Sequence, residues 1–461
     1  MNARLIKVWQ DLQSSYYFIP GLMAVGSIAL AYLTIHLDEQ YGLKVSEFGF
    51  FLSNKADGAR TILATIAGSM MGVAATTFSI TMVAVTSAAG QYGPRLIGNF
   101  MRDRGNQVTL GTFTSTFIYC LLILRVARTG DSGTGENMVA EFVPNISLLT
   151  AMGLTLTSVG VLIYFIHHVP ETLNVGNITG RVGRRLRNDI ESLYPRDLGE
   201  QNKDKDVDLS QFSLSDAKDI RSNAEGYIQT VNEDALLDLA NEHDAVVKIE
   251  YRPGDFVTQN DVLVRIWRDE ELDEDAQQKY RNAYAMGQDR TAHQNILFLA
   301  DELVEILARA LSPGVNDPFT AINCINWFQS AMKAFLRGNM PSPFRRDEDG
   351  ALRVIAYPIN FERFASVLCD QSRAYIATDR NTTLKMMTIL TELAAQTDSE
   401  PEKTILIEHL KKLKIASLEA CKSSPDSDDI EARFQRALRM TTDTDYFRHE
   451  QSSQRWIGGR G

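Results

Sequence analysis

The amino-acid sequence predicts an α-helical membrane domain of four transmembrane helices, followed by a mainly α cytoplasmic region with a small β-module. Two observations predict this division: the long uncharged apolar runs lie before Val169, and almost all acidic clusters lie after it. A third observation is a short stretch in the second half that alternates apolar and polar residues with the period of a strand. The chain therefore consists of a membrane half and a soluble half.

Composition and charge limit the classes of function. At 461 residues the chain is too long for one ordinary core, and its formal net charge is −11. Nucleic-acid binding needs clustered Lys and Arg to neutralise phosphates, so we expect no nucleic-acid partner. The four cysteines show no C-x-x-C spacing, which predicts reduced thiols rather than disulfides or a zinc site. We expect neither a cofactor nor a metal ion.

The membrane domain is predicted to occupy residues 1–170. Uncharged runs of about 18 or more residues are typical of membrane spans. Four runs meet this criterion, at residues 12–37, 61–94, 105–124 and 142–170. Lys and Arg number nine in the flanks on one side and five in the two opposite loops, which predicts that both termini are cytoplasmic. We expect a multi-pass protein of the bacterial inner membrane.

The second span, residues 61–94, has an unusual composition. Small and hydroxyl residues follow one another at steps of three or four, so they share one helical face: Thr65, Ser69, Gly72, Thr76, Ser79 and Thr86, with Val83 in the same row. Gly68 and Gly72 also form a G-x-x-x-G pattern. The face is either a packing seam, which the sequence favours within one protomer, or the wall of a permeation path. No Asp, Glu, Lys or Arg lies inside any predicted span, which argues against a proton relay.

A charged hairpin is predicted between the second and third spans, on the cytoplasmic side. Pro94 ends or kinks the preceding helix, and the hairpin carries the charged residues Arg95, Arg102, Asp103 and Arg104. The arginines are interpreted as topology anchors for lipid phosphates or as an anion-attracting mouth. Arg102-Asp103-Arg104 equally suits an ion pair that holds the hairpin to the soluble domain.

A family resemblance is carried by the four spans, by the hairpin sequence Q-Y-G-P-R-L-I-G-N-F-M-R-D-R-G-N-Q, and by a later R-A-L-S-P-G-V-N-D-P-F-T-A-I segment. Together they resemble the bacterial predicted-membrane-protein family labelled domain of unknown function 2254. The resemblance is collinear over nearly the whole chain, short of the last twenty or so residues. It implies an integral membrane protein with a soluble C-terminal portion, and it implies no catalytic residue.

The soluble half begins with a basic connecting helix and linker at residues 171–210. A small β-rich module is predicted at residues 211–268, where P-G-D-x-V resembles the barrel-sandwich of lipoyl and biotinyl carriers. Such carriers present a lysine at a hairpin tip, whereas Lys248 lies inside a predicted strand. We therefore expect a structural module without a prosthetic group. His167 and His168, at the end of the fourth span, are interpreted as boundary residues.

A helical cytoplasmic domain is predicted at residues 269–440, followed by a flexible tail at 441–461. Within it, Ser312-Pro-Gly ends one helix and Asp317-Pro begins the next. The loop is interpreted either as a well-formed turn or as a ligand loop that holds an anion at the helix N-terminus. The candidate ligand residues are Ser312, Asn316 and Asp317, with Asp289 and Arg290 as second contributors. The glycines of a P-loop are missing.

Two classes of function remain open. The first is an oligomeric channel or permeation protein, in which the second span lines the path and the cytoplasmic domain assembles or gates it. The second is a membrane-anchored regulatory, sensor or scaffolding protein whose cytoplasmic domain binds a protein or small ligand. No spacing typical of a catalytic triad or carboxylate pair is found, so we expect no enzyme. Expected partners are the lipid bilayer and further copies of the chain.

Overall fold

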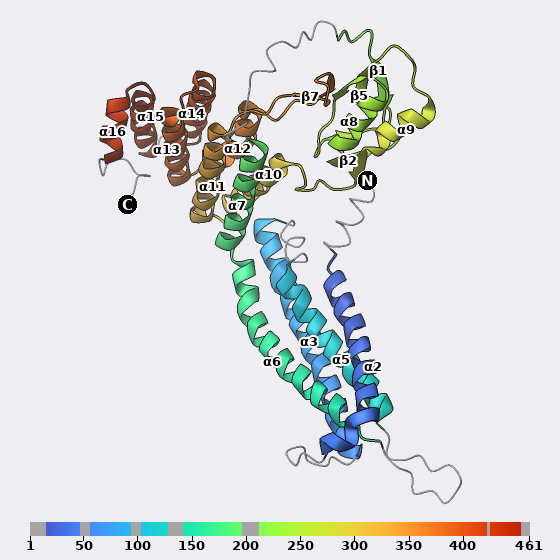
Figure 1. Ribbon diagram of the computed structural model, residues 1–461. Coiled ribbons are helices and arrows are strands. Elements are labelled where there is room, and N and C mark those ends of the chain that lie inside the picture. Colours follow the sequence, from blue (N-terminus) through green and yellow to red (C-terminus); the bar gives the residue numbers. More distant parts are fainter. Residues whose placement is uncertain are drawn as a thin grey trace, which may run out of the picture. The chain divides into compact units, whose positions relative to one another are not determined.

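The computed structural model describes residues 15–46, 56–93, 103–127, 142–195, 212–421 and 425–452 (Figure 1). These residues form two compact units that divide between Asn174 and Val175. The first unit contains the long apolar helices, and the second contains two sheets and the remaining helices. The predicted fold class, a four-helix membrane part followed by a mainly helical region with a small β-module, is confirmed.

In the described part of the membrane unit, four helices are long and apolar enough to cross a bilayer. They are α2 (Phe18–Ser46), α3 (Ala56–Tyr92), α5 (Arg104–Val126) and α6 (Asn145–Leu173). Helix α5 packs against each of the other three, and it is also the most buried of the four. Its Tyr119, Cys120 and Ile123 are fully buried in the core of the unit. At Gly111 there is no room for a larger side chain, because an added Cβ would lie 3.2 Å from the Cα of Pro20 in α2.

The first span extends further than its uncharged run. Helix α2 continues past Asp38, so the expectation that no carboxylate lies inside a span is wrong for this helix. Asp38 is only 5% exposed. Its carboxylate accepts hydrogen bonds from the backbone amides of Ile146 (2.7 Å) and Ser147 (2.9 Å) and from the Ser147 hydroxyl (2.6 Å). These donors belong to the first turn of α6, where unpaired amides and the helix dipole favour a negative charge. The charge is therefore used as a helix cap.

The second unit begins with α7 (Val175–Leu193), the predicted basic connecting helix. Four apolar residues that recur at steps of four are buried: Ile178, Val182, Leu186 and Ile190. They pack against α10 and α11, so this helix is an integral part of its unit. At Gly183 the helix lies directly against the indole of Trp327, with 2.3 Å between the nearest ring atom and the position that a Cβ would occupy. The rest of the predicted linker, residues 196–210, lies outside the described residues.

Two small sheets follow. The larger has the order β1-β5-β3-β8-β7, and the smaller has the order β4-β2-β6. The strands are β1 (Lys218–Arg221), β2 (Gly226–Val231), β3 (Val246–Ile249), β4 (Phe256–Val257), β5 (Val262–Trp267), β6 (Tyr284–Gly287), β7 (Phe344–Arg346) and β8 (Leu352–Ile355). All neighbours are antiparallel except β3 and β8, which pair in parallel. Helices α8 (Glu233–Glu242) and α9 (Glu274–Asn282) pack against strands of these sheets. Strands β6, β7 and β8 lie beyond residue 268, so the module draws on more of the chain than residues 211–268.

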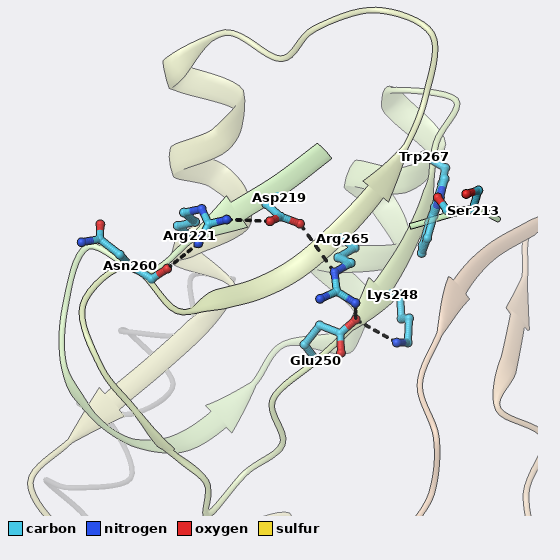
Figure 2. A network of polar contacts seen from close by, with 8 residues as sticks. All are labelled: Ser213, Asp219, Arg221, Lys248, Glu250, Asn260, Arg265 and Trp267. Carbon is cyan, nitrogen blue, oxygen red and sulfur yellow. Dashed lines mark hydrogen bonds and ion pairs between the residues drawn. The ribbon is translucent and has the colours of Figure 1, made fainter. Parts of the chain in front are cut away.

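Lys248 lies in strand β3, as predicted. Its ammonium group is 2.8 Å from a carboxylate oxygen of Glu250, which also binds Arg265 at 3.0 Å. The series continues from Arg265 to Asp219 and from Asp219 to Arg221, so that charges of opposite sign alternate across the sheet (Figure 2). A lysine held in such a series is not presented for attachment of a prosthetic group.

The remaining helices are α10 (Ile296–Ala310), α11 (Pro318–Arg337), α12 (Phe361–Ile376), α13 (Arg380–Gln396), α14 (Glu400–Ala420), α15 (Asp426–Thr442) and α16 (Thr444–Ser452). Their core is rich in phenylalanine, and the rings of Phe335 and Phe364 stack at 5.2 Å. Helix α16 buries Phe447, so the first part of the predicted flexible tail is helical instead. Residues 453–461 lie outside the described part of the chain.

All four cysteines are free, in agreement with the predicted reduced thiols. Cys120, Cys324 and Cys369 are buried, and Cys421 is partly buried. In the second unit, burial raises the pKa of the Cys324 and Cys369 thiols above the usual range. A thiol that resists ionisation is a poor nucleophile and a poor metal ligand.

Candidate functional site

The small and hydroxyl face of α3 points away from its own helix bundle. Every one of its predicted members is exposed: Thr65, Ser69, Gly72, Thr76, Ser79 and Thr86. A Cβ added at Gly68 or Gly72 would meet no atom within 4 Å, so none of the described helices of the same unit approaches the G-x-x-x-G pattern. The preference for a packing seam within one protomer is therefore wrong. We call the six exposed residues the hydroxyl face.

A different stripe of α3 makes the contacts inside the bundle. Its buried residues are Ala56, Ala59, Leu63, Ala67, Met70, Ala74, Thr81, Val85 and Ala89, and they face α5 and α6. The two stripes are interleaved: Ser69 follows Ala67 by two residues, which is about 200° around a helix. Alanine, like glycine and serine, is small enough to let helix backbones approach each other closely. Both stripes are present in the sequence. The hydroxyl residues predicted packing for one stripe, whereas the alanine-rich stripe is the one that packs.

The hydroxyl face is long enough to cross the apolar core of a membrane. From Thr65 to Thr86 the helix rises by about 32 Å, compared with about 30 Å for the hydrocarbon layer. The Thr65 hydroxyl donates to the backbone oxygen of Thr61 at 2.7 Å, so its oxygen remains able to accept a hydrogen bond. Such a surface accepts hydrogen bonds and carries no charge.

The outward surfaces of the neighbouring helices differ from it. Helix α6 exposes large apolar side chains, with Leu156 at 74% and Ile163 at 67%, as a lipid-facing helix does. Helix α6 also exposes a shorter row, Gly153, Thr157 and Gly160, beside these residues. The exposed side of α3 is itself mixed, since Val83 is 72% exposed. What distinguishes α3 is the length of its hydroxyl row.

Asp103, at the end of the predicted hairpin, is bound within the membrane unit. Asp103 caps helix α5 by accepting a hydrogen bond from the Asn106 amide at 3.1 Å, and the same oxygen lies 2.8 Å from Nε2 of His168. Tyr164 stacks on the His168 ring at 5.0 Å, and Gly105 leaves room for it, since a Cβ there would lie 2.7 Å from Nε2. The described partners of Asp103 thus belong to its own unit rather than to the soluble domain. His168 connects α6 to α5 and is more than a boundary residue.

The hairpin arginines are only partly described. Arg104 is the first residue of α5 and is exposed, whereas Arg95 and Arg102 lie outside the described residues, as does Pro94.

The candidate ligand loop forms a capped turn. Asp317 accepts hydrogen bonds from the amides of Phe319 and Thr320, both at 3.1 Å, and from the Thr320 hydroxyl at 2.6 Å. Ser312 is bonded to the backbone of Arg309, and Asn316 adopts a positive φ of 49° that closes the turn. The helix N-terminus proposed to hold an anion is therefore already filled by the carboxylate of Asp317.

The second contributors do not reach this loop. Asp289 and Arg290 precede α10, whereas Ser312 to Asp317 follow it, and α10 is about 22 Å long. Arg290 is instead paired with Asp301 at 2.5 Å, and the backbone oxygen of Asp289 accepts a hydrogen bond from Gln229. The structure does not bring the two groups together as one site.

A search of known proteins agrees with the membrane assignment. The family model described as "Predicted membrane protein (DUF2254)" matches residues 13–392, which include both motifs on which the resemblance depends, although the match ends earlier than the resemblance implied. A protein of Mycobacterium tuberculosis and one of Mycobacterium bovis, both described as uncharacterized, are 28% identical to this chain over 356 residues. The alignment covers 76% of this chain and 66% of each relative, so the chain spans just under two thirds of their length. No solved structure matches the chain.

Proposed function

The chain belongs to the DUF2254 family of predicted membrane proteins, and we propose that it forms a homo-oligomeric permeation path in a bacterial cytoplasmic membrane. In this proposal, copies of α3 surround a common axis and direct their hydroxyl faces toward it. Both termini and the second unit lie in the cytoplasm, where the second unit assembles or gates the path.

The exposure of the hydroxyl face carries this proposal. In contact with lipid, a row of Thr, Ser and Gly residues gains less than the Leu and Ile residues that α6 exposes. Packing inside the bundle is already provided by the alanine stripe on the other side of α3. Further copies of the chain, or water between them, are the environments that remain for this face.

A closed ring of protomers also explains how a chain with only four spans can form a path. The three helices that pack around α5 enclose no aqueous channel, because α5 fills the centre of the unit. Symmetric association places the same face of each copy at one axis, so a single helix per protomer is sufficient to line a path. The wall would be uncharged and would select by size and hydration rather than by charge.

Ion flux tests this function. The full chain in liposomes is expected to release a trapped ion, and Thr76→Leu and Ser79→Leu are each expected to reduce the flux on the order of tenfold, since leucine narrows and dries the path. Thr157→Leu is the matched control, because Thr157 is an exposed threonine on α6 whose hydroxyl is bonded to its own helix. The readout is an ion-sensitive dye inside the liposomes. Absence of flux from the unmodified protein, or an equal loss in the control, would remove the proposal.

A second function class is supported by a separate observation. The second unit contains a cavity lined by two arginine side chains, which suits a membrane-anchored sensor that binds a small ligand. The two classes are compatible, since a ligand-binding unit can regulate a path.

A further inference from the structure

We infer that the second unit binds a small organic anion, with one carboxylate or phosphate group and an apolar body, in a cavity between its sheets and its helices. The cavity has a volume of about 230 Å³. Its lining comes from distant parts of the chain: the end of α7, the turn after β3, the start of α10 and the segments that flank β7 and β8.

The charge of the lining selects an anion. Arg252 and Arg345 line the cavity together with one carboxylate, that of Glu233. Within the described part of the chain, Arg345 donates only to the backbone oxygen of Ser342, and the Arg252 guanidinium makes no ion pair. Two guanidinium groups without carboxylate partners leave a net positive site, and the planar fork of each group matches the oxygens of a carboxylate or phosphate.

The positions of these arginines are fixed by the backbone. The Arg252 amide donates to Asp255 at 2.8 Å, and Gly254 in the same turn donates to Ile228 of strand β2 at 2.7 Å. Gly254 has a positive φ of 97° and lies against Asn295, the cap of α10, so the turn has no room to move in that direction. Arg345 is held in strand β7 opposite Val354. The backbone that carries both arginines is therefore held in place before a ligand arrives, which reduces the entropic cost of binding.

The remaining walls favour an apolar body. Ile249, Ile296 and Ile359 line the cavity together with three prolines. Tyr194 is buried at one wall, where its hydroxyl donates to the backbone oxygen of Ile359 at 2.8 Å. Burial raises the pKa of Tyr194 to about 12, and the positive charge of Arg252 opposes this shift. Drug-sized ligands occupy about 300–1,000 Å³, so this cavity suits a smaller molecule.

A larger cavity in the same unit lacks these properties. It has a volume of about 690 Å³ and is lined in part by Arg281. The guanidinium of Arg281 is already bonded to Glu274 at 2.6 Å, to the backbone of Arg221 at 2.9 Å and to Gln277 at 3.1 Å. The arginine of this cavity is therefore already paired, and the other charged residue of its described lining is the acidic Glu225, so the cavity does not suit an anion.

Binding of phenyl phosphate to the full chain in detergent tests the inference. Titration calorimetry is expected to show one site per chain, with affinity reduced about tenfold or more in Arg252→Gln and in Arg345→Gln. Arg345→Lys, which keeps the charge and loses the fork, is expected to show a smaller reduction. Arg346→Gln is the matched control, because Arg346 follows on the same strand, does not line the cavity and bonds to the Gly350 backbone.

Two further probes and a folding check complete the test. Benzyl alcohol, which lacks the charge, and inorganic phosphate, which lacks the apolar body, are both expected to bind at least tenfold more weakly than phenyl phosphate. Thermal melting without ligand identifies any variant that fails to fold, in which case Arg345→Lys replaces it. The inference is overturned if phenyl phosphate does not bind, if inorganic phosphate binds as tightly, or if Arg346→Gln weakens binding as much as the two cavity variants. None of these outcomes depends on ion flux, so this site and the permeation path are tested separately.

Discussion

Replacing Asp38 by alanine is expected to destabilise the membrane unit by about 2–4 kcal/mol, because the amides of Ile146 and Ser147 then lose their acceptor in a buried position. The same substitution removes the hydrogen bond from the Ser147 hydroxyl. Helix α6 would lose the charge that caps its first turn and connects it to α2. We expect a lower melting temperature of the full chain in detergent and faster proteolysis near residue 145.

A series of substitutions separates this cap from a general effect of charge. Asp38→Asn keeps one acceptor oxygen and is expected to fall between the unmodified protein and Asp38→Ala. Glu39→Ala is the control, since the neighbouring Glu39 side chain is 64% exposed and, among the described residues, forms an ion pair only with His36, at 4.0 Å. If Asp38→Ala melts at the same temperature as Glu39→Ala, the capping role of Asp38 is refuted.

Gly183→Ala is expected to destabilise the second unit by about 1–3 kcal/mol, although alanine is the better helix former. The new methyl group would lie 2.3 Å from the ring of Trp327, and a rigid indole cannot give way as a flexible side chain does. Gly180→Ala is the matched control, because a methyl group there meets its nearest neighbour at an ordinary 3.4 Å. The control is expected to be neutral or slightly stabilising. Thermal melting of the full chain gives both values.

A double substitution identifies the cause. Trp327→Ala removes the ring, so Gly183→Ala should cost little in that background, and the two changes should be strongly non-additive. Additive effects would mean that the close approach of α7 and α11 at this glycine does not determine stability.

The spans and most of the helices could be predicted from the sequence, because uncharged runs and helical periods are local signals. Sequence prediction failed at Asp38, where a charge was taken as the end of a span although donors at the start of α6, distant in the chain, form hydrogen bonds to the carboxylate. The pairing of β3 with β8 also has no local signal, since about a hundred residues separate the two strands.

The candidate sites show the same limit. Both stripes of α3 have helical spacing, and only the position of α5 decides which is buried. At the Ser312 loop, the pattern that predicted an anion site is equally the pattern of a helix cap, and Asp317 fills it. The pairing of Asp103 with His168 joins two spans, and no spacing in the sequence indicates it. The cavity with Arg252 and Arg345 depends on strands that meet only in the fold.

Cysteine cross-linking in native membranes tests most directly whether the hydroxyl faces of neighbouring copies meet. In a background of Cys421→Ser, which removes the one cysteine that is not buried, Thr76→Cys and Ser79→Cys are predicted to form cross-linked dimers with a short thiol-specific reagent. Ala74→Cys, buried toward α5, and Thr157→Cys, exposed on α6, are predicted to remain monomeric. Monomers alone at positions 76 and 79, or cross-linking that is equally strong at position 157, would contradict the account.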